Sequence, residues 1–74
     1  MASGYQELQL TIAANTRTLR EAKGLSQEAL ALEADVDRTY VSQIERGVAN
    51  PSLRVLYQLA HILDVSLLEL IGDR

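Results

Sequence analysis

The sequence contains no cysteine, no tryptophan and no phenylalanine, and it has a single proline. Without cysteine there is no disulfide and no thiolate-bound metal, so a chain of 74 residues must fold on its hydrophobic core alone. No apolar run approaches the roughly 20 residues of a membrane span, and the start, MASGYQEL, lacks the basic-then-apolar layout of a secretory signal. These absences predict one small cytoplasmic domain with no membrane partner.

Hydrophobic residues are abundant, at 47% of the chain, and without Phe and Trp they are mainly Leu, Ile, Val and Ala. This composition favours an interior in which helices pack on helices. Helix signals recur along the whole chain, and strand signals do not. We therefore predict a compact, all-α domain of five helices over residues 1–74.

The helix boundaries follow from apolar spacing and from residues that cap helix ends. Ser26, Asp37, Ser52 and Ser66 stand where a side chain can accept a hydrogen bond from the first turn of a helix. Glu69 stands three residues after Ser66, as a capping box requires. The predicted helices cover about residues 6–23, 26–34, 38–46, 52–63 and a short segment after 66.

The net charge of −3 argues, taken alone, against a nucleic-acid partner. The distribution of charge weakens that argument, because six of the seven basic residues lie between Arg17 and Arg54. Charges interact over a Debye length of about 8 Å at physiological salt, so a local basic patch matters more than the total. The acidic balance lowers the expectation of nucleic-acid binding without excluding it.

The segment DRTYVSQIERG, residues 37–47, combines two apolar residues with an unusual number of long polar ones. Val41 and Ile44 share one helix face, which we expect to be buried against Leu30 and Ala34 of the preceding helix. The polar residues then project from the other faces: Arg38, Thr39, Ser42, Gln43 and Arg46. A helix mounted in this way has the geometry that enters a DNA major groove. Arg can bind guanine, Gln can bind adenine and a Thr methyl can contact thymine.

From about Ile12 to Ile71 the chain resembles the Cro and phage-repressor type of helix-turn-helix protein, often called XRE. The resemblance is carried by LREAKGLSQEALA and by DRTYVSQIERGVANPSLRVLYQLAHILDVSLLEL. It implies a lambda-repressor-like fold with the helix-turn-helix unit at about residues 27–46. The segment DRTYVSQIERG and the single-domain length look most like restriction–modification controller proteins, which are small dimeric regulators. One departure is Asp35, which stands where the family usually has a turn glycine.

The resemblance also implies roles for individual residues. It matches Gln27 to a phosphate-binding position at the start of the second helix, and it matches Arg20 and Glu45 to a structural salt bridge between the first and third helices. The residues that the resemblance assigns to DNA binding are Gln27, Arg38, Thr39, Tyr40, Ser42, Gln43, Arg46 and Asn50.

Each of these assignments has a plainer alternative. The long charged and amide side chains could form an ordinary solvated helix face. Thr39 and Ser42 could bond to the backbone of their own helix. The ring of Tyr40 could pack at the edge of the core with only its hydroxyl outside, and Gln27 could be an ordinary first-turn polar residue.

The C-terminal third, about residues 52–71, carries more apolar residues than one core-facing stripe requires. The surplus predicts a partner surface, and a two-fold homodimer is the commonest arrangement. A dimer also places two reading helices about 34 Å apart, which suits a palindromic site. The alternative is a core that uses all of these side chains. The residues predicted in the interface are Leu63, Val65, Leu67 and Leu68.

The function predicted from these features is transcriptional regulation by a homodimer bound to a palindromic operator in double-stranded DNA. An alternative is a protein-binding antitoxin or adaptor module built on the same fold. An enzyme is not expected, because the sequence contains no visible nucleophile–base pair, phosphate-binding loop or metal-ligand set. For the same reason no cofactor and no small-molecule ligand is predicted.

Overall fold

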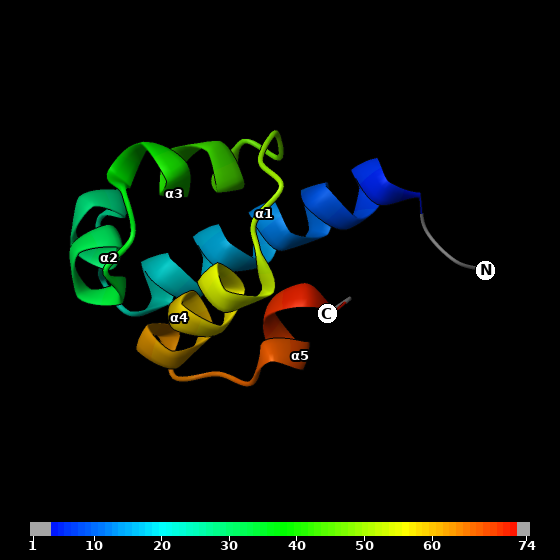
Figure 1. Cartoon of the computed structure of the whole chain (residues 1–74). Coiled ribbons are helices and arrows are strands. Elements are labelled where there is room, and N and C mark those ends of the chain that lie inside the picture. The colour runs from blue at the N-terminus through cyan, green and yellow to red at the C-terminus, as the bar shows by residue number, and fades with distance from the viewer. Residues whose placement is uncertain (1–3, 73–74) are drawn as a thin grey trace.

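The computed structural model describes residues 4–72, which form five helices and no strand (Figure 1). The all-α prediction is therefore confirmed, and the predicted boundaries agree with the observed ones to within one or two residues. The helices are α1 (Tyr5–Ala22), α2 (Gln27–Ala34), α3 (Arg38–Glu45), α4 (Leu53–Leu63) and α5 (Leu67–Ile71). No helix in residues 4–72 is long and apolar enough to cross a membrane.

The predicted capping residues begin four of the five helices. The side chains of Ser26, Asp37, Ser52 and Ser66 each accept a hydrogen bond from a backbone N–H of the first turn, at 3.0, 2.7, 3.1 and 3.1 Å. Glu69 completes the capping box by accepting from the Ser66 N–H at 3.0 Å. These bonds satisfy backbone donors that a helix start leaves without an intrahelical partner.

The turn between α2 and α3 depends on Asp35, which has a φ of 59° and a ψ of 46°. This is the left-handed conformation that glycine adopts without cost and that aspartate tolerates better than most residues. Asp35 therefore makes the tight turn for which the resemblance implies a glycine, at a cost of about 1 kcal/mol.

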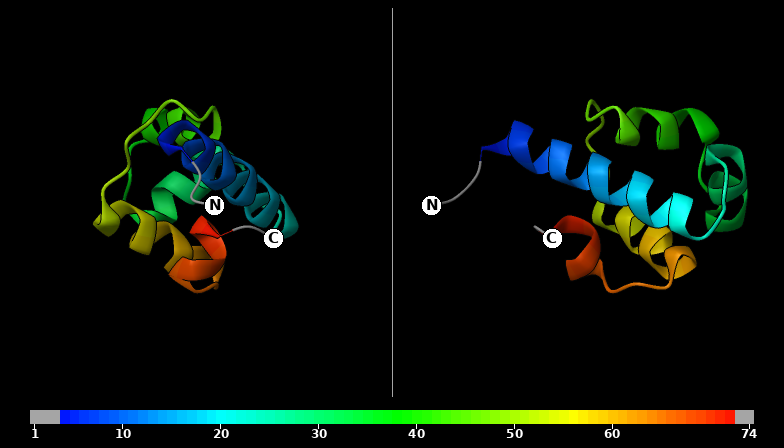
Figure 2. Two further views of the ribbon diagram at one scale, coloured as in Figure 1. Left: turned by 90° about the vertical axis from the view of Figure 1, so that its right-hand side faces the viewer. Right: turned by 180° about the vertical axis from the view of Figure 1, so that it is seen from behind.

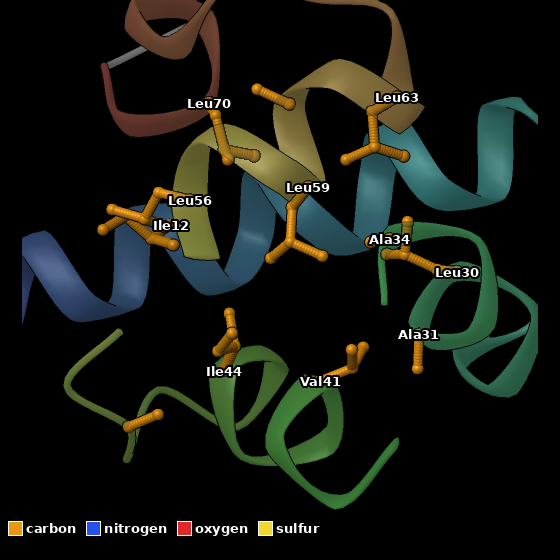
Figure 3. Packing of buried hydrophobic residues seen from close by; sticks show 12 residues of the cluster. Ile12, Leu30, Ala31, Ala34, Val41, Ile44, Leu56, Leu59, Leu63 and Leu70 are labelled. Carbon is orange, nitrogen blue, oxygen red and sulfur yellow. The ribbon is translucent and has the colours of Figure 1, made fainter. Parts of the chain in front are cut away.

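The hydrophobic core lies between the five helices, each of which contributes at least one buried side chain to it (Figure 3). Leu30, Val41, Leu59 and Leu70 are completely buried, and Ile44 is nearly so. The expectation that Val41 and Ile44 pack with Leu30 and Ala34 is confirmed, because all four belong to this cluster. Burying each large side chain contributes about 1.5–3 kcal/mol, so α3 is held to the domain by its apolar face.

Helix α1 is the longest element, and its N-terminal half extends beyond the rest of the domain (Figure 2). Its middle carries Asn15, which is buried and donates from Nδ2 to the carbonyl oxygens of Leu70 and Gly72 at 2.9 and 2.8 Å. These acceptors lie at the C-terminal end of α5, where a helix leaves carbonyl groups without intrahelical partners. Asn15 therefore fixes α5 against α1.

The residues predicted for a dimer interface fall into three classes of exposure. Leu63 is only 3% exposed and belongs to the core of its own subunit. Its assignment to an interface is wrong, because the sequence pattern could not show which apolar face of α4 is turned inward. Val65 and Leu67 are half-buried at the edge of the core, whereas Leu68 is 76% exposed.

Candidate nucleic-acid interface

The outer face of α3 is open to solvent and polar. Arg38, Thr39 and Arg46 are exposed, and Ser42 and Gln43 are half-buried. Helix α3 packs through its opposite side on α1 and α2, so no part of the described chain covers the polar edge (Figure 1). The structure thus places these five predicted residues side by side on one accessible helix surface.

A notch of about 230 Å³ lies between the start of α2 and the start of α3. Its lining consists of Gln27, Arg38, Thr39 and Ser42. Two helix N-termini therefore flank a recess whose side chains include hydroxyl, amide and guanidinium donors. Backbone N–H groups and the helix dipole make such termini favourable for an anion, and a DNA phosphate is an anion of suitable size.

A buried carboxylate fixes α3 to the helices behind it. The Glu45 side chain is fully buried and accepts from Arg20 Nε at 2.6 Å and from Arg20 Nη2 at 3.0 Å. Arg20 also donates from Nη1 to the Leu25 carbonyl at 2.8 Å. This two-bond ion pair is the one that the family resemblance implied between α1 and α3. A paired geometry of this kind is strong and directional.

The same carboxylate also holds Gln27. Gln27 Nε2 donates to Glu45 Oε1 at 3.0 Å, and Arg17 Nε lies 3.6 Å from that oxygen. Gln27 is therefore not a free first-turn residue, because one amide hydrogen is committed to Glu45 and its position beside the notch is fixed. The second amide hydrogen remains for a ligand.

Burial alone would raise the pKa of Glu45, but its partners have the larger combined effect. Hydrogen bonds from Arg20 and Gln27 and the positive charges of Arg20 and Arg17 bring the pKa of Glu45 below its ordinary value. Chiefly because of the hydrogen bond to Glu45, the pKa of Arg20 is raised. Both groups therefore stay charged at neutral pH, and the network is intact under physiological conditions.

The loop after α3 is held by side chains from both sides. The Tyr40 hydroxyl donates to the Asn50 carbonyl oxygen at 3.2 Å, and the ring of Tyr40 packs against the core edge. The Tyr5 hydroxyl donates to Asn50 Oδ1, and Gln9 Nε2 donates to the Ala49 carbonyl oxygen at 2.8 Å. The main chain and the side chain of Asn50 are therefore both held, in the loop that directly follows the C-terminal end of α3.

Tyr5 and Gln9 were not among the residues that the sequence singled out. They lie four apart on α1 and so share a helix face, but their partners lie 45 and 40 positions later, respectively. The available signal is a tyrosine and a glutamine at helical spacing in a part of α1 that the core does not need. That pattern alone does not identify the loop they contact.

A helix-turn-helix family model, HTH_3, matches residues 17–70 of the chain. The chain belongs to this helix-turn-helix family. The match spans α2, α3 and α4 completely, together with the C-terminal part of α1 and most of α5. The resemblance to XRE-type proteins is therefore confirmed, together with the helix-turn-helix fold.

Solved helix-turn-helix structures share the architecture over most of the chain. The restriction–modification controller protein C.AhdI from Aeromonas hydrophila is 45% identical, with a TM-score of 0.81 over 84% of this chain and 94% of that chain. The hypothetical transcription factor NHTF from Neisseria is 37% identical, with a TM-score of 0.88 over 99% of this chain and 84% of that chain. The arrangement of α1 to α5 is thus that of known regulators.

Curated helix-turn-helix relatives include regulators of several lengths. The uncharacterized HTH-type transcriptional regulator y4dJ of Sinorhizobium fredii is 37% identical over 88% of this chain and 84% of its own length. The control protein C.BamHI of Bacillus amyloliquefaciens is 41% identical over 78% of this chain and 73% of its own. The chain spans only 36% of the regulator SlrR of Bacillus subtilis.

Proposed function

We propose that this helix-turn-helix regulator binds a palindromic operator in double-stranded DNA as a homodimer and controls transcription in the cytoplasm. One observation carries the proposal: the polar edge of α3 is exposed, while its apolar edge and Glu45 anchor it firmly to α1 and α2. A rigid helix that presents long donors outward is what groove recognition requires.

Within the proposed complex, the exposed side chains of α3 divide by chemistry. Arg38, Thr39, Ser42 and Gln43 lie along the N-terminal and middle part of α3 and would contact base edges in the major groove. Arg46, which caps the C-terminal end of α3, would contact the DNA backbone or a neighbouring base. Contacts to bases supply sequence choice, whereas contacts to phosphates supply affinity.

Two further residues would bind phosphates on either side of α3. Gln27 stands at the start of α2 beside the notch, with one amide hydrogen held by Glu45. Asn50 stands in the loop after α3, where Tyr40 holds its main chain. Contacts before and after the reading helix would fix its register in the groove.

The proposed dimer uses the outer surface around α5. Leu68 is the most exposed leucine there, and Val65 and Leu67 lie half-buried beside it. Leu63 is left out because its own subunit covers it. One short helix reads too few base pairs to define an operator. A two-fold contact through this surface would supply a second α3 and so match a palindromic site.

Selection of bound sequences from a random DNA pool tests the proposal directly. We expect enrichment of a palindrome whose half-sites are about one helical turn apart, near 34 Å. A matched selection with Arg38→Ala should lose preference at one position of each half-site. A protein-binding module on the same fold would instead enrich no sequence, and that result would refute the proposal.

A further inference from the structure

We propose that Tyr5 is a positioning residue that orients the amide of Asn50 toward a DNA phosphate. This inference rests on the proposed function and deepens it, because it assigns the first turns of α1 to DNA recognition. It starts from one juxtaposition: the hydroxyl of Tyr5, near the N-terminus, bonds to the side-chain oxygen of Asn50 in the loop after α3.

The loop between α3 and α4 is held at successive positions by α1 and α3. Gln9 Nε2 donates to the carbonyl oxygen of Ala49 at 2.8 Å, and Tyr40 donates to that of Asn50 at 3.2 Å. Ala49 itself is buried. The main chain of the loop is therefore fixed, and the remaining freedom of Asn50 is the rotation of its side chain, which Tyr5 removes.

A contact with Leu10 fixes the start of the same loop. Gly47 has a φ of +75°, and a Cβ placed there would lie 2.8 Å from Leu10 Cδ2. The left-handed backbone favours glycine at this position, and the exposed side chain of Leu10 lies directly over it. The first turns of α1 follow the shape of the loop closely.

The chemistry of the amide determines which end must face DNA. A carboxamide has an oxygen that accepts and a nitrogen that donates, whereas a phosphate oxygen only accepts. A tyrosine hydroxyl can serve either end, so in a DNA complex the amide oxygen of Asn50 turns to Tyr5 and Nδ2 turns to the phosphate. Within residues 4–72, Nδ2 of Asn50 donates no hydrogen bond, so both of its hydrogens remain available.

The position of Tyr5 supports a role in recognition over a role in stability. The side chain is 58% exposed, and neither Tyr5 nor Gln9 belongs to the hydrophobic cluster. The first turns of α1, which project past the rest of the domain in Figure 1, contact the loop through Tyr5 and Gln9. Fixing a side chain before binding removes the entropy cost of ordering it in the complex.

The test compares Tyr5→Phe, Asn50→Ala and the double variant on the selected operator. We expect each single variant to lower affinity by about three- to tenfold, the range that ordering one side chain implies. The double variant should bind no more weakly than Asn50→Ala alone, because Tyr5 acts through Asn50. Losses that multiply in the double variant would overturn the inference.

Operators with a single methylphosphonate give a readout that a merely structural role of Tyr5 would not move. Replacing one charged phosphate oxygen by methyl should weaken wild-type binding at the phosphate that Asn50 contacts. Asn50→Ala should be clearly less sensitive to that replacement than the wild type, and Tyr5→Phe should be intermediate, while Arg38→Ala should be as sensitive as the wild type. Sensitivity in Tyr5→Phe equal to that of the wild type would overturn the inference.

Tyr57→Phe is the matched control, since it removes a hydroxyl from α4 that makes no hydrogen bond within residues 4–72. Its affinity and its thermal midpoint should equal those of the wild type, as should the thermal midpoint of Tyr5→Phe. If the wild type enriches no sequence, the proposed function fails and this inference fails with it. If the wild type binds its operator and Tyr5→Phe binds equally well, only this inference fails.

Discussion

The outer faces of α3 and of α5 differ in the chemistry that they present to solvent. Helix α3 exposes Arg38, Thr39 and Arg46, whereas α5 exposes Leu68. A hydrated, charged polymer such as DNA is recognised by donors on a rigid support, and burying an exposed leucine in a dimer removes apolar surface from water. Under the proposed function, DNA would bind the reading face, which carries Arg38, Thr39 and Arg46, and the second subunit would bind the assembly face around Leu68.

The supports of the two faces differ as well. Helix α3 is anchored by apolar packing and by the ion pair of Glu45 and Arg20. Helix α5 is anchored by Leu70 and by the amide of Asn15 at its C-terminal end. The ion pair of Glu45 depends on pH, whereas the neutral amide of Asn15 does not. At acid pH we therefore expect α3 to lose its anchor before α5 does.

The largest effect is expected from Glu45→Gln, which leaves Arg20 without its charge partner in a buried place. Removing one partner of a buried pair costs about 3–5 kcal/mol, so the midpoint of urea unfolding should fall sharply. Glu33→Gln, on the exposed side of α2, is the control and should change stability by less than about 0.5 kcal/mol. Equal, small losses in both variants would show that the ion pair does not hold α3.

The lowered pKa of Glu45 also predicts how the free energy of unfolding falls at acid pH. Because the pKa of Glu45 is lowered in the folded state, its contribution is fully present above the ordinary carboxyl value of about 4.5. That contribution is lost as the pH falls through the lower folded-state pKa. Urea unfolding at a series of pH values should show a steeper acid loss for the wild type than for Glu45→Gln, and parallel curves would contradict the assignment.

Leu68→Glu should prevent dimerisation through α5 without changing the structure of α3. A charge at the centre of the proposed contact should yield monomers in sedimentation and reduce operator affinity by about a hundredfold or more, since two half-sites no longer act together. Leu32→Glu, at an equally exposed leucine on α2, should leave the oligomeric state unchanged. A Leu68→Glu protein that remains dimeric would place the interface elsewhere.

Arg38→Ala should weaken operator binding by about 1–3 kcal/mol and relax the base preference at one position of each half-site. The reason is the loss of a two-bond contact between a guanidinium group and a base edge. Binding to the selected operator and to a scrambled duplex should be compared. An equal loss on both would show that Arg38 contacts only the phosphate backbone.

The smallest effect is expected from Arg46→Ala on the salt dependence of binding. Because the proposed homodimer carries two copies of Arg46, losing both phosphate contacts should reduce the slope of log affinity against log salt concentration by about two. Fluorescence anisotropy over a range of salt concentrations measures that slope. An unchanged slope would assign Arg46 to a base contact or to no contact.

Much of the fold could be predicted from local signals. The caps at Ser26, Asp37, Ser52 and Ser66 act within one turn, so short sequence patterns contain all the information they need. The packing of Val41 and Ile44 followed from helical spacing. Asp35 adopts the left-handed conformation that the resemblance implied for a turn at this position.

The remaining features depend on contacts between distant parts of the chain. Leu63 was misassigned because α4 is apolar on more than one side, and the positions of α2 and α5, on which α4 packs, decide which side is buried. Asn15 lies in the middle of a helix, where its acceptors 55 and 57 residues later cannot be guessed. The bond from Tyr5 to Asn50 spans 45 positions and leaves no local pattern.

Helix α1 contacts both the loop after α3 and the C-terminal end of α5. Tyr5 touches the loop beside α3, and Asn15, ten residues later, grips the end of α5. Ten residues of helix measure about 15 Å and bend little, so α1 behaves as a stiff strut. Under the proposed assembly, α1 would keep a constant distance within each subunit between the dimer contact at α5 and the loop that approaches DNA.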